Sequence, residues 1–413
     1  MRMAAVFGLN QVVSHGFGVF LFAALLPLMR ESIAISNWQL ASIGALTQLS
    51  YLAGALLLGL IGHRIGTVRL ALVTTSLTTG LLFLMSQLRD PLHITLALVI
   101  LAASASISWG TIVEIISRYA NKASCSTTMS CASSGTAWGY GINGLLILLV
   151  VPHLGWESGW VIAGGVGVLA LILSWNLLRG LAPAGVASFD TDAANVISVA
   201  GAEAIPARQL LAVILRERTA FFACLICCLV GFSAMPFSAW LNLYLDERGL
   251  PAALGGYTWT VVGITGMIAG LLIGKLADHK GHGTAFTVIF SGFALGLLAF
   301  MFDPARWALL AGFGYGLMYF PMWGIVAGWV SQHYGSTATM QINGVCMVTF
   351  GMGGTLGNLL AGYLREATGS LSLMYDILTV TALLLVALGL FIRHTGKGAA
   401  VTEGVIPPLS DAA

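Results

Sequence analysis

Residues 274–281 read GKLADHKG and residues 59–66 read GLIGHRIG, so a pair of glycines with the same spacing recurs 215 positions later. Each stretch follows a long apolar run and precedes another one. The same register holds elsewhere, since Gly16-Phe17 recurs as Gly231-Phe232 at an offset of 215 and Trp109-Gly110 recurs as Trp323-Gly324 at 214. Self-similarity at one offset indicates related units. We therefore expect two parallel halves, residues 1–180 and 219–395.

The composition around these stretches is that of a membrane protein. Only 8% of the residues are charged and 58% are hydrophobic, whereas a soluble domain carries about a quarter of charged residues. A transmembrane helix needs about 20 residues, and helices satisfy their backbone polar groups within lipid. We predict an all-α membrane protein with twelve transmembrane helices in two pseudo-symmetric six-helix bundles. The predicted spans are 5–29, 39–62, 68–88, 94–117, 127–151, 158–179, 219–244, 253–277, 284–302, 306–331, 339–363 and 371–393.

The distribution of Lys and Arg predicts the orientation. Of the 18 Lys and Arg residues, thirteen fall on the side that holds both termini, and five fall on the other, namely Arg30, Arg89, Arg248, Arg306 and Arg365. Cytoplasmic loops carry the excess of positive charge, so we expect both termini in the cytoplasm and a plasma-membrane location, the inner membrane of a bacterium. Residues 181–218 are a predicted cytoplasmic connector, either plain or with residues 206–218 as an amphipathic helix on the inner leaflet. Residues 396–413 are a predicted cytoplasmic tail.

The two quoted stretches carry a resemblance to the major facilitator superfamily. Residues 274–281 closely match its cytoplasmic loop motif, G-x-L-x-D-[RK]-x-G, while residues 59–66 have His63 where the family usually has Asp. The resemblance extends over the full length in span count, layout and repeat, and it implies a secondary transporter that works by alternating access. It also implies that the loops latch the outward-open state, which gives gating roles to Gly59, His63, Arg64, Gly66, Gly274, Asp278, Lys280 and Gly281. His63 would weaken the first-half latch or make it depend on pH, unless it is only a solvated loop residue.

In that family, spans 1, 4, 7 and 10 line the central cavity. In this sequence those spans offer aromatic, Met, hydroxyl and amide side chains near the midplane, a composition usual for small-molecule sites. The predicted substrate-binding residues are Gln11, His15, Phe22, Ser108, Thr111, Met235, Ser238, Asn242, Tyr315, Tyr319 and Trp323.

Two ionisable residues within spans are candidates for proton coupling. His15 lies on the most polar face of the first span, and the reference pKa of histidine is about 6.5. It can bind substrate, take up the coupling proton, or serve as a structural residue bonded to a neighbouring helix. Glu114 lies four residues before Arg118 near the cytoplasmic end of span 4, so an i, i+4 ion pair competes with a coupling role.

The sequence also excludes several functions. No Lys or Arg lies near the middle of a predicted span, which argues against substrates with several negative charges. The sequence contains no G-x-x-x-x-G-K-[ST] loop, so the chain alone is not an ATP-driven pump. The first span lacks the paired acids of the family's aromatic-acid symporters, which argues against that branch, whereas a monocarboxylate held by dipoles, hydroxyls and a protonated His15 stays open. The net charge of +2 gives no sign of a nucleic-acid partner. No His or carboxylate lies near the cysteines at 224, 227 and 228 to complete a metal site.

We therefore expect a secondary active transporter of a small organic solute, either a monocarboxylate or a weakly polar or aromatic compound. The proton is the expected coupling ion, with facilitated diffusion as the alternative. A drug or metabolite exporter of the same fold and a non-transporting receptor on a carrier fold are the other candidates. Span 5 has no proline until Pro152, which favours a narrower specificity than that of multidrug exporters. We expect no enzymatic activity, no cofactor and no metal, and a monomer whose partners are the solute, the bilayer and protons.

Overall fold

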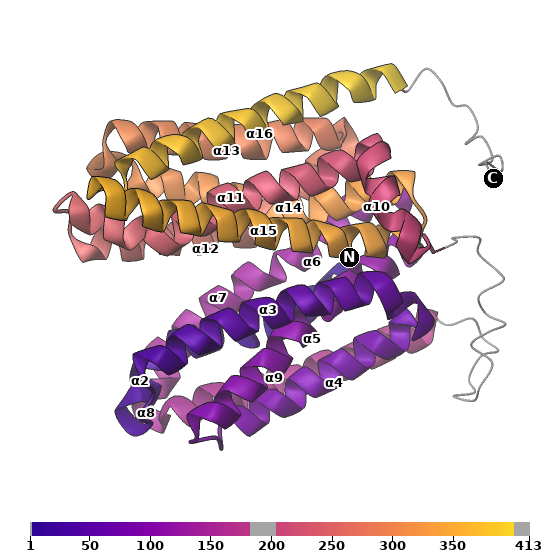
Figure 1. The fold of residues 1–413 in the computed structure, drawn as a ribbon. Helices are drawn as coiled ribbons and strands as arrows, with labels where there is room; N and C mark the ends of the chain where they lie inside the picture. The colour runs from indigo at the N-terminus through magenta and orange to yellow at the C-terminus, as the bar shows by residue number, and fades with distance from the viewer. Residues whose placement is uncertain (1, 182–203, 400–413) are drawn as a thin grey trace.

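The computed structural model describes residues 2–181 and 204–399, and these residues form helices joined by short connections. Within them, twelve helical segments are long and apolar enough to cross a membrane. The segments form two bundles of six (Figure 1). Each predicted span overlaps one of the twelve. The prediction of an all-α membrane protein with two six-helix bundles is confirmed.

The first bundle comprises residues 2–181. Its first segment consists of α1 (Arg2–Gln11), the π-helical turn η1 (Val12–Phe17) and α2 (Leu21–Ser32). Then follow α3 (Asn37–Ile61), η2 (Gly62–Arg64), α4 (Thr67–Met85), α5 (Pro91–Tyr119) and η3 (Lys122–Ser124). The fifth segment consists of α6 (Cys125–Ser133), α7 (Gly135–Leu145), the π-helical turn η4 (Leu146–Val150) and α8 (Val151–Leu154), and the sixth is α9 (Trp156–Leu181).

The second bundle has six continuous helices. They are α11 (Arg218–Glu247), α12 (Ala252–Lys280), α13 (His282–Phe302), α14 (Pro304–His333), α15 (Ser336–Thr368) and α16 (Ser372–Ala399). The short helix α10 (Ala207–Arg216) precedes them at the end of the connector.

Equivalent segments pair in the two bundles, as the sequence repeat predicts. The first segment crosses the fifth, which means α1 and η1 on α6 and α7 in the first bundle and α11 on α15 in the second. The second segment packs on the fourth, as α3 on α5 and α12 on α14. The third segment packs on the sixth, as α4 on α9 and α13 on α16. Glycines permit the close crossings. A Cβ on Gly16 would lie 2.5 Å from the Cα of Gly139, and a Cβ on Gly231 would lie 2.1 Å from the carbonyl oxygen of Phe350.

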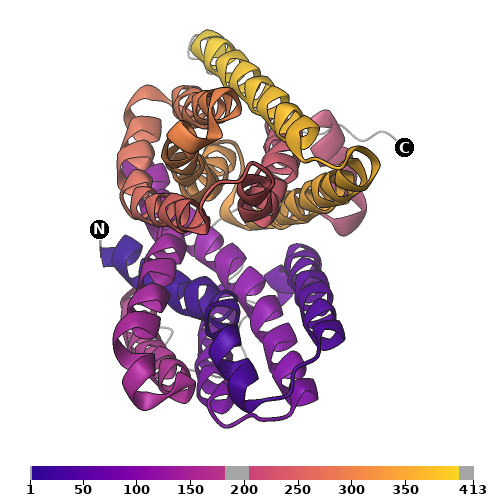
Figure 2. The ribbon, with the colours of Figure 1, turned by 90° about the vertical axis from the view of Figure 1, so that its left-hand side faces the viewer.

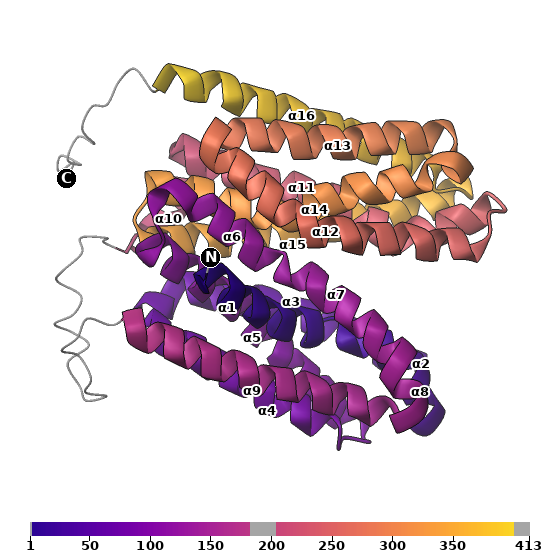
Figure 3. The same cartoon turned by 180° about the vertical axis from the view of Figure 1, so that it is seen from behind.

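The two bundles converge at one end of the molecule and diverge at the other (Figures 1 and 3). The end where they meet carries the start of the first segment, the ends of α9 and α16 and the start of α10, and we call it the connector end. Seen from the opposite end, the bundles lie side by side (Figure 2). They contact each other along two symmetric seams, α6 against α12 and α14, and α15 against α3 and α5.

The first and fifth segments were predicted as single helices, and both are interrupted. In the first segment Gly16 lies in the π-helical turn η1 and permits the crossing, and Gly18 follows η1 with its backbone packed closely against the preceding turn. A Cβ on Gly18 would lie 2.4 Å from the carbonyl oxygen of Ser14. The side-chain amide of Asn143 in α7 donates a hydrogen bond to the carbonyl oxygen of Gly16 (2.8 Å). A side chain from the fifth segment thus satisfies a backbone acceptor in the interrupted first segment, which helps to stabilise the π turn.

The connector is described only in its last part, because residues 182–203 lie outside the described residues, as does the predicted tail from residue 400 onward. The side-chain amide of Gln341 in α15 donates to the carbonyl oxygen of Ile205 (2.9 Å) and accepts from its backbone N–H (2.8 Å). Helix α10 buries Leu210 and Ile214 in the core of the second bundle and exposes Leu211. The predicted helix at residues 206–218 exists and packs on protein through one of its faces, while its position on a leaflet stays a prediction.

Candidate functional site

A cavity of about 330 Å³ lies between the two bundles. Its walls come from the first, second, fourth and fifth segments of each bundle, so the two bundles contribute equivalent elements. The lining residues are Gln11, His15, Val19, Phe20, Gln48, Tyr51, Trp109, Ser133, Thr136, Tyr140, Met235, Ser238, Trp259, Val262, Gly263, Tyr315, Tyr319, Phe320, Trp323, Met347 and Phe350. None of these lining residues, within the described parts of the chain, is a Lys, Arg, Asp or Glu.

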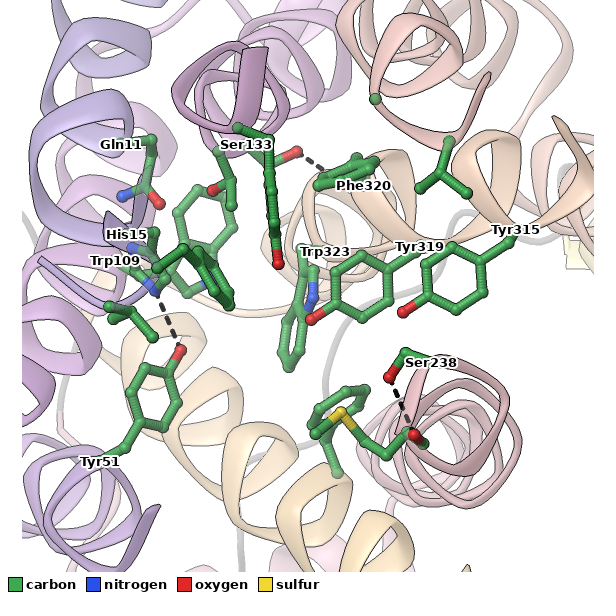
Figure 4. A pocket seen from close by; sticks show the side chains of 18 of the residues that line it. Gln11, His15, Tyr51, Trp109, Ser133, Ser238, Tyr315, Tyr319, Phe320 and Trp323 are labelled. Carbon is green, nitrogen blue, oxygen red and sulfur yellow. Dashed lines mark hydrogen bonds between the residues drawn. The ribbon is translucent and has the colours of Figure 1, made fainter. Parts of the chain in front are cut away.

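His15 lies on the π-helical turn at the first-bundle wall of the cavity. Its Nε2 lies 3.1 Å from the hydroxyl oxygen of Tyr51 in α3, and its Nδ1 lies 3.2 Å from the Oγ of Ser14. Figure 4 shows the bond from His15 to Tyr51 at the edge of the cavity. Because a hydroxyl group can donate or accept, both ring nitrogens keep a partner whether the imidazole is neutral or protonated.

Two buried side chains of the first-bundle wall carry hydrogen-bond donors that have no partner among the described residues. They are the Nε2 of Gln11 and the indole Nε1 of Trp109. The two residues are only 2% and 3% exposed. Buried donors are normally paired, and leaving one unpaired costs about 1–3 kcal/mol. Both nitrogens are themselves buried, so a bound acceptor group would satisfy them once the side chain turns its N–H toward the cavity.

The hydroxyl groups of two serines in the cavity lining already donate hydrogen bonds to main-chain carbonyls. The Oγ of Ser133 donates to the carbonyl oxygen of Phe320 in the other bundle (2.8 Å), and the Oγ of Ser238 donates to the carbonyl oxygen of Met235 (2.8 Å). Their hydroxyl oxygens can still accept a hydrogen bond, but their hydrogens are used. The two buried donors of the lining that lack a partner among the described residues therefore both lie on the first-bundle side.

Aromatic rings of α14 form the opposite wall. The rings of Tyr315 and Tyr319 stack with centroids 5.2 Å apart and an interplanar angle of 15°. The ring of Trp259 meets that of Tyr315 edge-on with centroids 5.9 Å apart, and the ring centroids of Trp323 and Phe350 are 5.0 Å apart. Figure 4 shows Gln11, His15 and Trp109 facing this aromatic wall across the cavity. The site is thus polar on one side and aromatic on the other, without a fixed charge in its lining.

Seven of the eleven predicted binding residues line this cavity together, namely Gln11, His15, Met235, Ser238, Tyr315, Tyr319 and Trp323. The other four lie elsewhere. Phe22 is buried in the core of the first bundle. Ser108 and Thr111 are buried within α5, where the Thr111 hydroxyl donates to the carbonyl oxygen of Ser108 (2.8 Å). The Oδ1 of Asn242 lies against Gly255, 2.1 Å from where a Cβ on that glycine would be.

The prediction missed the second and fifth segments of each bundle, because it followed the family pattern of spans 1, 4, 7 and 10. The missed polar residues of these segments are Gln48 and Tyr51 in α3, Ser133 in α6, Thr136 and Tyr140 in α7, and Trp259 in α12. Trp109 was also missed, although it lies in α5, one of the four spans that the prediction followed. One signal was present in the sequence. Trp109-Gly110 is the repeat of Trp323-Gly324, and Trp323 was among the predicted residues, so the repeat could have identified Trp109.

At the connector end, Asp278 joins the two bundles. Its carboxylate accepts hydrogen bonds from the backbone N–H groups of Ser126 (3.0 Å) and Thr127 (2.8 Å) and from the Thr127 hydroxyl (2.5 Å). These groups belong to the first turn of α6 in the other bundle, and a helix N-terminus favours a negative charge. The Nε2 of His282 lies 2.7 Å from the Oγ of Ser126. We call this set the α6 latch.

The first-half loop keeps the turn of the motif. Gly66 has a φ of 86° and Gly281, at the equivalent place, has a φ of 85°, a conformation that glycine adopts without strain. The side chain of His63 lies outside the described part of the structure, and the side chains of Arg64 and Lys280 are exposed. The remaining motif glycines lie on the seams, since a Cβ on Gly274 would be 2.6 Å from the Cα of Thr127 and one on Gly59 would be 3.5 Å from the carbonyl oxygen of Gln341.

Glu114 occupies the seam between α5 and α15 and is 2% exposed. Its carboxylate accepts hydrogen bonds from Arg118 (2.5 Å), from the hydroxyl of Thr67 and from the hydroxyl of Thr337 (3.4 Å). The guanidinium of Arg118 also donates to the Oγ of Ser336 (3.3 Å). The i, i+4 ion pair is present, and it links α4 and α5 to the start of α15.

No group of three or more His, Cys, Asp or Glu in residues 2–181 and 204–399 is placed to hold a metal ion. The cysteines at 125, 131, 224, 227, 228 and 346 are free thiols.

The chain is similar to known transporters in sequence and in fold. The sequence profile of the Major Facilitator Superfamily matches residues 11–341. A gallate transporter of Pseudomonas putida is 22% identical over 301 residues, which are 68% of this chain and 66% of that protein, just under two thirds of its length. FucP, the fucose:proton symporter of E. coli, solved in the outward conformation, has a TM-score of 0.73 at 15% identity and covers 95% of this chain and 98% of its own. The proton:xylose symporter XylE bound to 6-bromo-6-deoxy-D-glucose has a TM-score of 0.70 at 12% identity and covers 95% of each chain. At these identities the structural likeness concerns the fold alone.

Proposed function

The chain belongs to the major facilitator superfamily, and on that premise we propose that it is a proton-coupled carrier of a small organic solute that works by alternating access. The observation that carries the proposal is the cavity between the bundles, with the bundles held together at one end by the α6 latch. A cavity walled by both bundles changes its exposure when one bundle rocks against the other. The latch can form only while the connector end is closed.

The proposed orientation places the connector end in the cytoplasm. The excess of Lys and Arg lies on this side, as expected of cytoplasmic loops. With the connector end closed, the cavity faces the outside, so the structure corresponds to the outward-facing state of the proposed cycle.

We propose His15 as the proton-coupling residue. It lies at the cavity wall, where solute and proton can reach the same place, and its hydrogen bonds to Tyr51 and Ser14 suit both protonation states of the imidazole. Glu114 is a weaker candidate for this role, because its carboxylate is paired with Arg118 outside the cavity lining.

The proposed solute is a monocarboxylate or a weakly polar aromatic compound. The aromatic wall provides stacking surface. The lining has no Lys or Arg that could balance a multiply charged anion. The similarity to a gallate transporter is in line with this proposal.

The experiment is uptake into proteoliposomes with and without an imposed proton gradient. We expect an inward proton gradient to drive accumulation of benzoate or gallate by the natural protein and not by His15→Ala. The matched control is His93→Ala, because His93 is an exposed histidine at the start of α5. Both variants should keep the Tm of the natural protein. Equal accumulation by His15→Ala and His93→Ala contradicts the coupling role, and ligand binding without any flux favours a receptor.

A further inference from the structure

We propose that the cavity binds a planar aromatic carboxylate in one orientation, with the carboxylate against Gln11 and Trp109 of the first bundle and the ring against Tyr315 and Tyr319 of the second. The inference rests on the proposed function, whose solute class it specifies. It assigns a recognition role to two donor groups that belong to different helices, α1 and α5.

The carboxylate position follows from the unpaired donors. Gln11 and Trp109 line the cavity, are at least 97% buried, and carry N–H groups without a partner in the described residues. The amide of Gln11 can rotate by half a turn without moving the rest of the side chain, so either of its ends can face the cavity. An indole nitrogen offers a donor and no acceptor. A ligand group that only accepts hydrogen bonds therefore fits this side of the cavity better than a donor group does.

The ring position follows from the aromatic wall. Tyr315 and Tyr319 present two nearly parallel rings, and their hydroxyl groups point into the cavity (Figure 4). A flat ring packs against such a surface by offset or edge-to-face contact, which adds about 0.5–1.5 kcal/mol to the burial of its area, or about two- to tenfold in affinity. Polar substituents on that ring would meet the tyrosine hydroxyls at the end opposite the carboxylate.

Aromatic cages also bind cations, since the faces of aromatic rings attract positive charge. In this cavity two observations oppose a cation. The described lining contains no carboxylate, and its unpaired groups at Gln11 and Trp109 are donors, whose positive ends repel a cation.

The charge of the carboxylate needs compensation, because an anion in a cavity of low dielectric is costly without a partner. His15 lies on the same wall as Gln11, one helical turn further along. A protonated imidazole there would neutralise the bound carboxylate, so that solute and proton enter together. The recognition site and the proposed coupling residue thus share one side of the cavity.

The test measures binding to the detergent-purified full chain by calorimetry, with benzoate, cyclohexanecarboxylate and benzyltrimethylammonium as probes. Benzoate and cyclohexanecarboxylate share the carboxylate and differ in the ring. We expect the natural protein to prefer benzoate over cyclohexanecarboxylate by several-fold and to bind both more tightly than benzyltrimethylammonium.

Trp109→Phe removes the indole donor and keeps a ring. We expect it to weaken the binding of both carboxylates at least tenfold, the effect of losing one hydrogen bond to a charged group. The ratio of the affinities for benzoate and cyclohexanecarboxylate should stay unchanged. The matched control is Trp160→Phe, because Trp160 is also buried with an unpaired indole Nε1 but lies in the first-bundle core outside the cavity. Gln11→Met provides a second variant on the donor side. Tyr319→Leu should instead abolish the preference for benzoate.

Equal affinities of Trp109→Phe and Trp160→Phe for benzoate, with unchanged Tm, overturn the proposal, as does tighter binding of the ammonium probe than of benzoate. Binding is measured without a membrane, so the outcome is separable from the carrier function. The expected binding pattern without flux leaves the recognition site valid and refutes the carrier. Flux of another solute without benzoate binding supports the carrier function and refutes the recognition site.

Discussion

Replacing Asp278 with Asn should release the connector end. The carboxylate accepts three hydrogen bonds from α6 of the other bundle, at 3.0, 2.8 and 2.5 Å. Hydrogen bonds to a charged group contribute about 1.5–3 kcal/mol each. Asn keeps one acceptor oxygen, loses the charge at the helix N-terminus and turns an NH₂ group toward donors. We therefore expect a loss of about 2–3 kcal/mol, which raises the fraction of molecules with an open connector end about 30- to 150-fold.

Cys125 is a natural reporter of this opening. The residue is 6% exposed, and its Sγ lies 3.6 Å from the Oγ of Ser331 in the other bundle. In a protein that keeps Cys125 as its single cysteine, the rate of alkylation by N-ethylmaleimide should follow the open population. We expect this rate to rise at least about tenfold in Asp278→Asn, given the estimated loss.

Asp90→Asn is the matched control for this prediction. Asp90 accepts backbone hydrogen bonds from Leu92 (2.8 Å) and His93 (3.2 Å) at the start of α5, within its own bundle. These bonds hold the pKa of its carboxyl group below the ordinary value, and Asn replaces Asp well at a helix N-cap. We expect the Cys125 alkylation rate to stay unchanged. Equal rates in Asp278→Asn and Asp90→Asn would refute the latch.

Two further predictions concern packing and the connector. Gly139→Ala would put a Cβ 2.4 Å from the Cα of Gly16, so we expect a destabilisation of about 3 kcal/mol and a lower Tm in thermal unfolding. The control is Gly144→Ala, which has open space around it and should leave the Tm unchanged or raise it slightly. Similar Tm values for both variants would contradict the close crossing of the first and fifth segments. Gln341→Ala removes both hydrogen bonds to the backbone of Ile205, which together contribute about 2 kcal/mol. Limited trypsinolysis should then cut the connector about 30-fold faster. An unchanged rate would show that the hydrogen bonds from Gln341 do not hold the connector.

The twelve-helix fold was predictable because it depends on long apolar runs and on the repeat. The interruption of the first segment was not, since the π turn over Val12–Phe17 is stabilised by the bond from Asn143, a residue far away in sequence. This break also changes which face of the first segment points inward. Residues before it, such as Gln11, were placed correctly at the cavity, whereas Phe22 after it faces the bundle core.

The candidate site was predictable in its character and only partly in its residues. Aromatic and amide side chains on α14 and α1 were identified from the cavity-lining spans that the family resemblance implies, together with their helical spacing. Ser108 was predicted, yet its neighbour Trp109 lines the cavity instead, because a shift of one residue turns a helix face by about 100°. Tyr51 was missed, because it lies in α3, outside the four spans that the prediction followed. Its bond to His15 joins two helices, which sequence spacing cannot reveal.

The most direct test of the central claim is proton movement driven by solute alone. Proteoliposomes loaded with a pH-sensitive dye, with no imposed pH gradient, receive external benzoate, and the internal pH is recorded against liposomes that contain His15→Ala. Our account predicts faster internal acidification with the natural protein than with the variant, at a rate that saturates with benzoate concentration. Identical acidification in both preparations, equal to that of protein-free liposomes, would contradict proton-coupled transport.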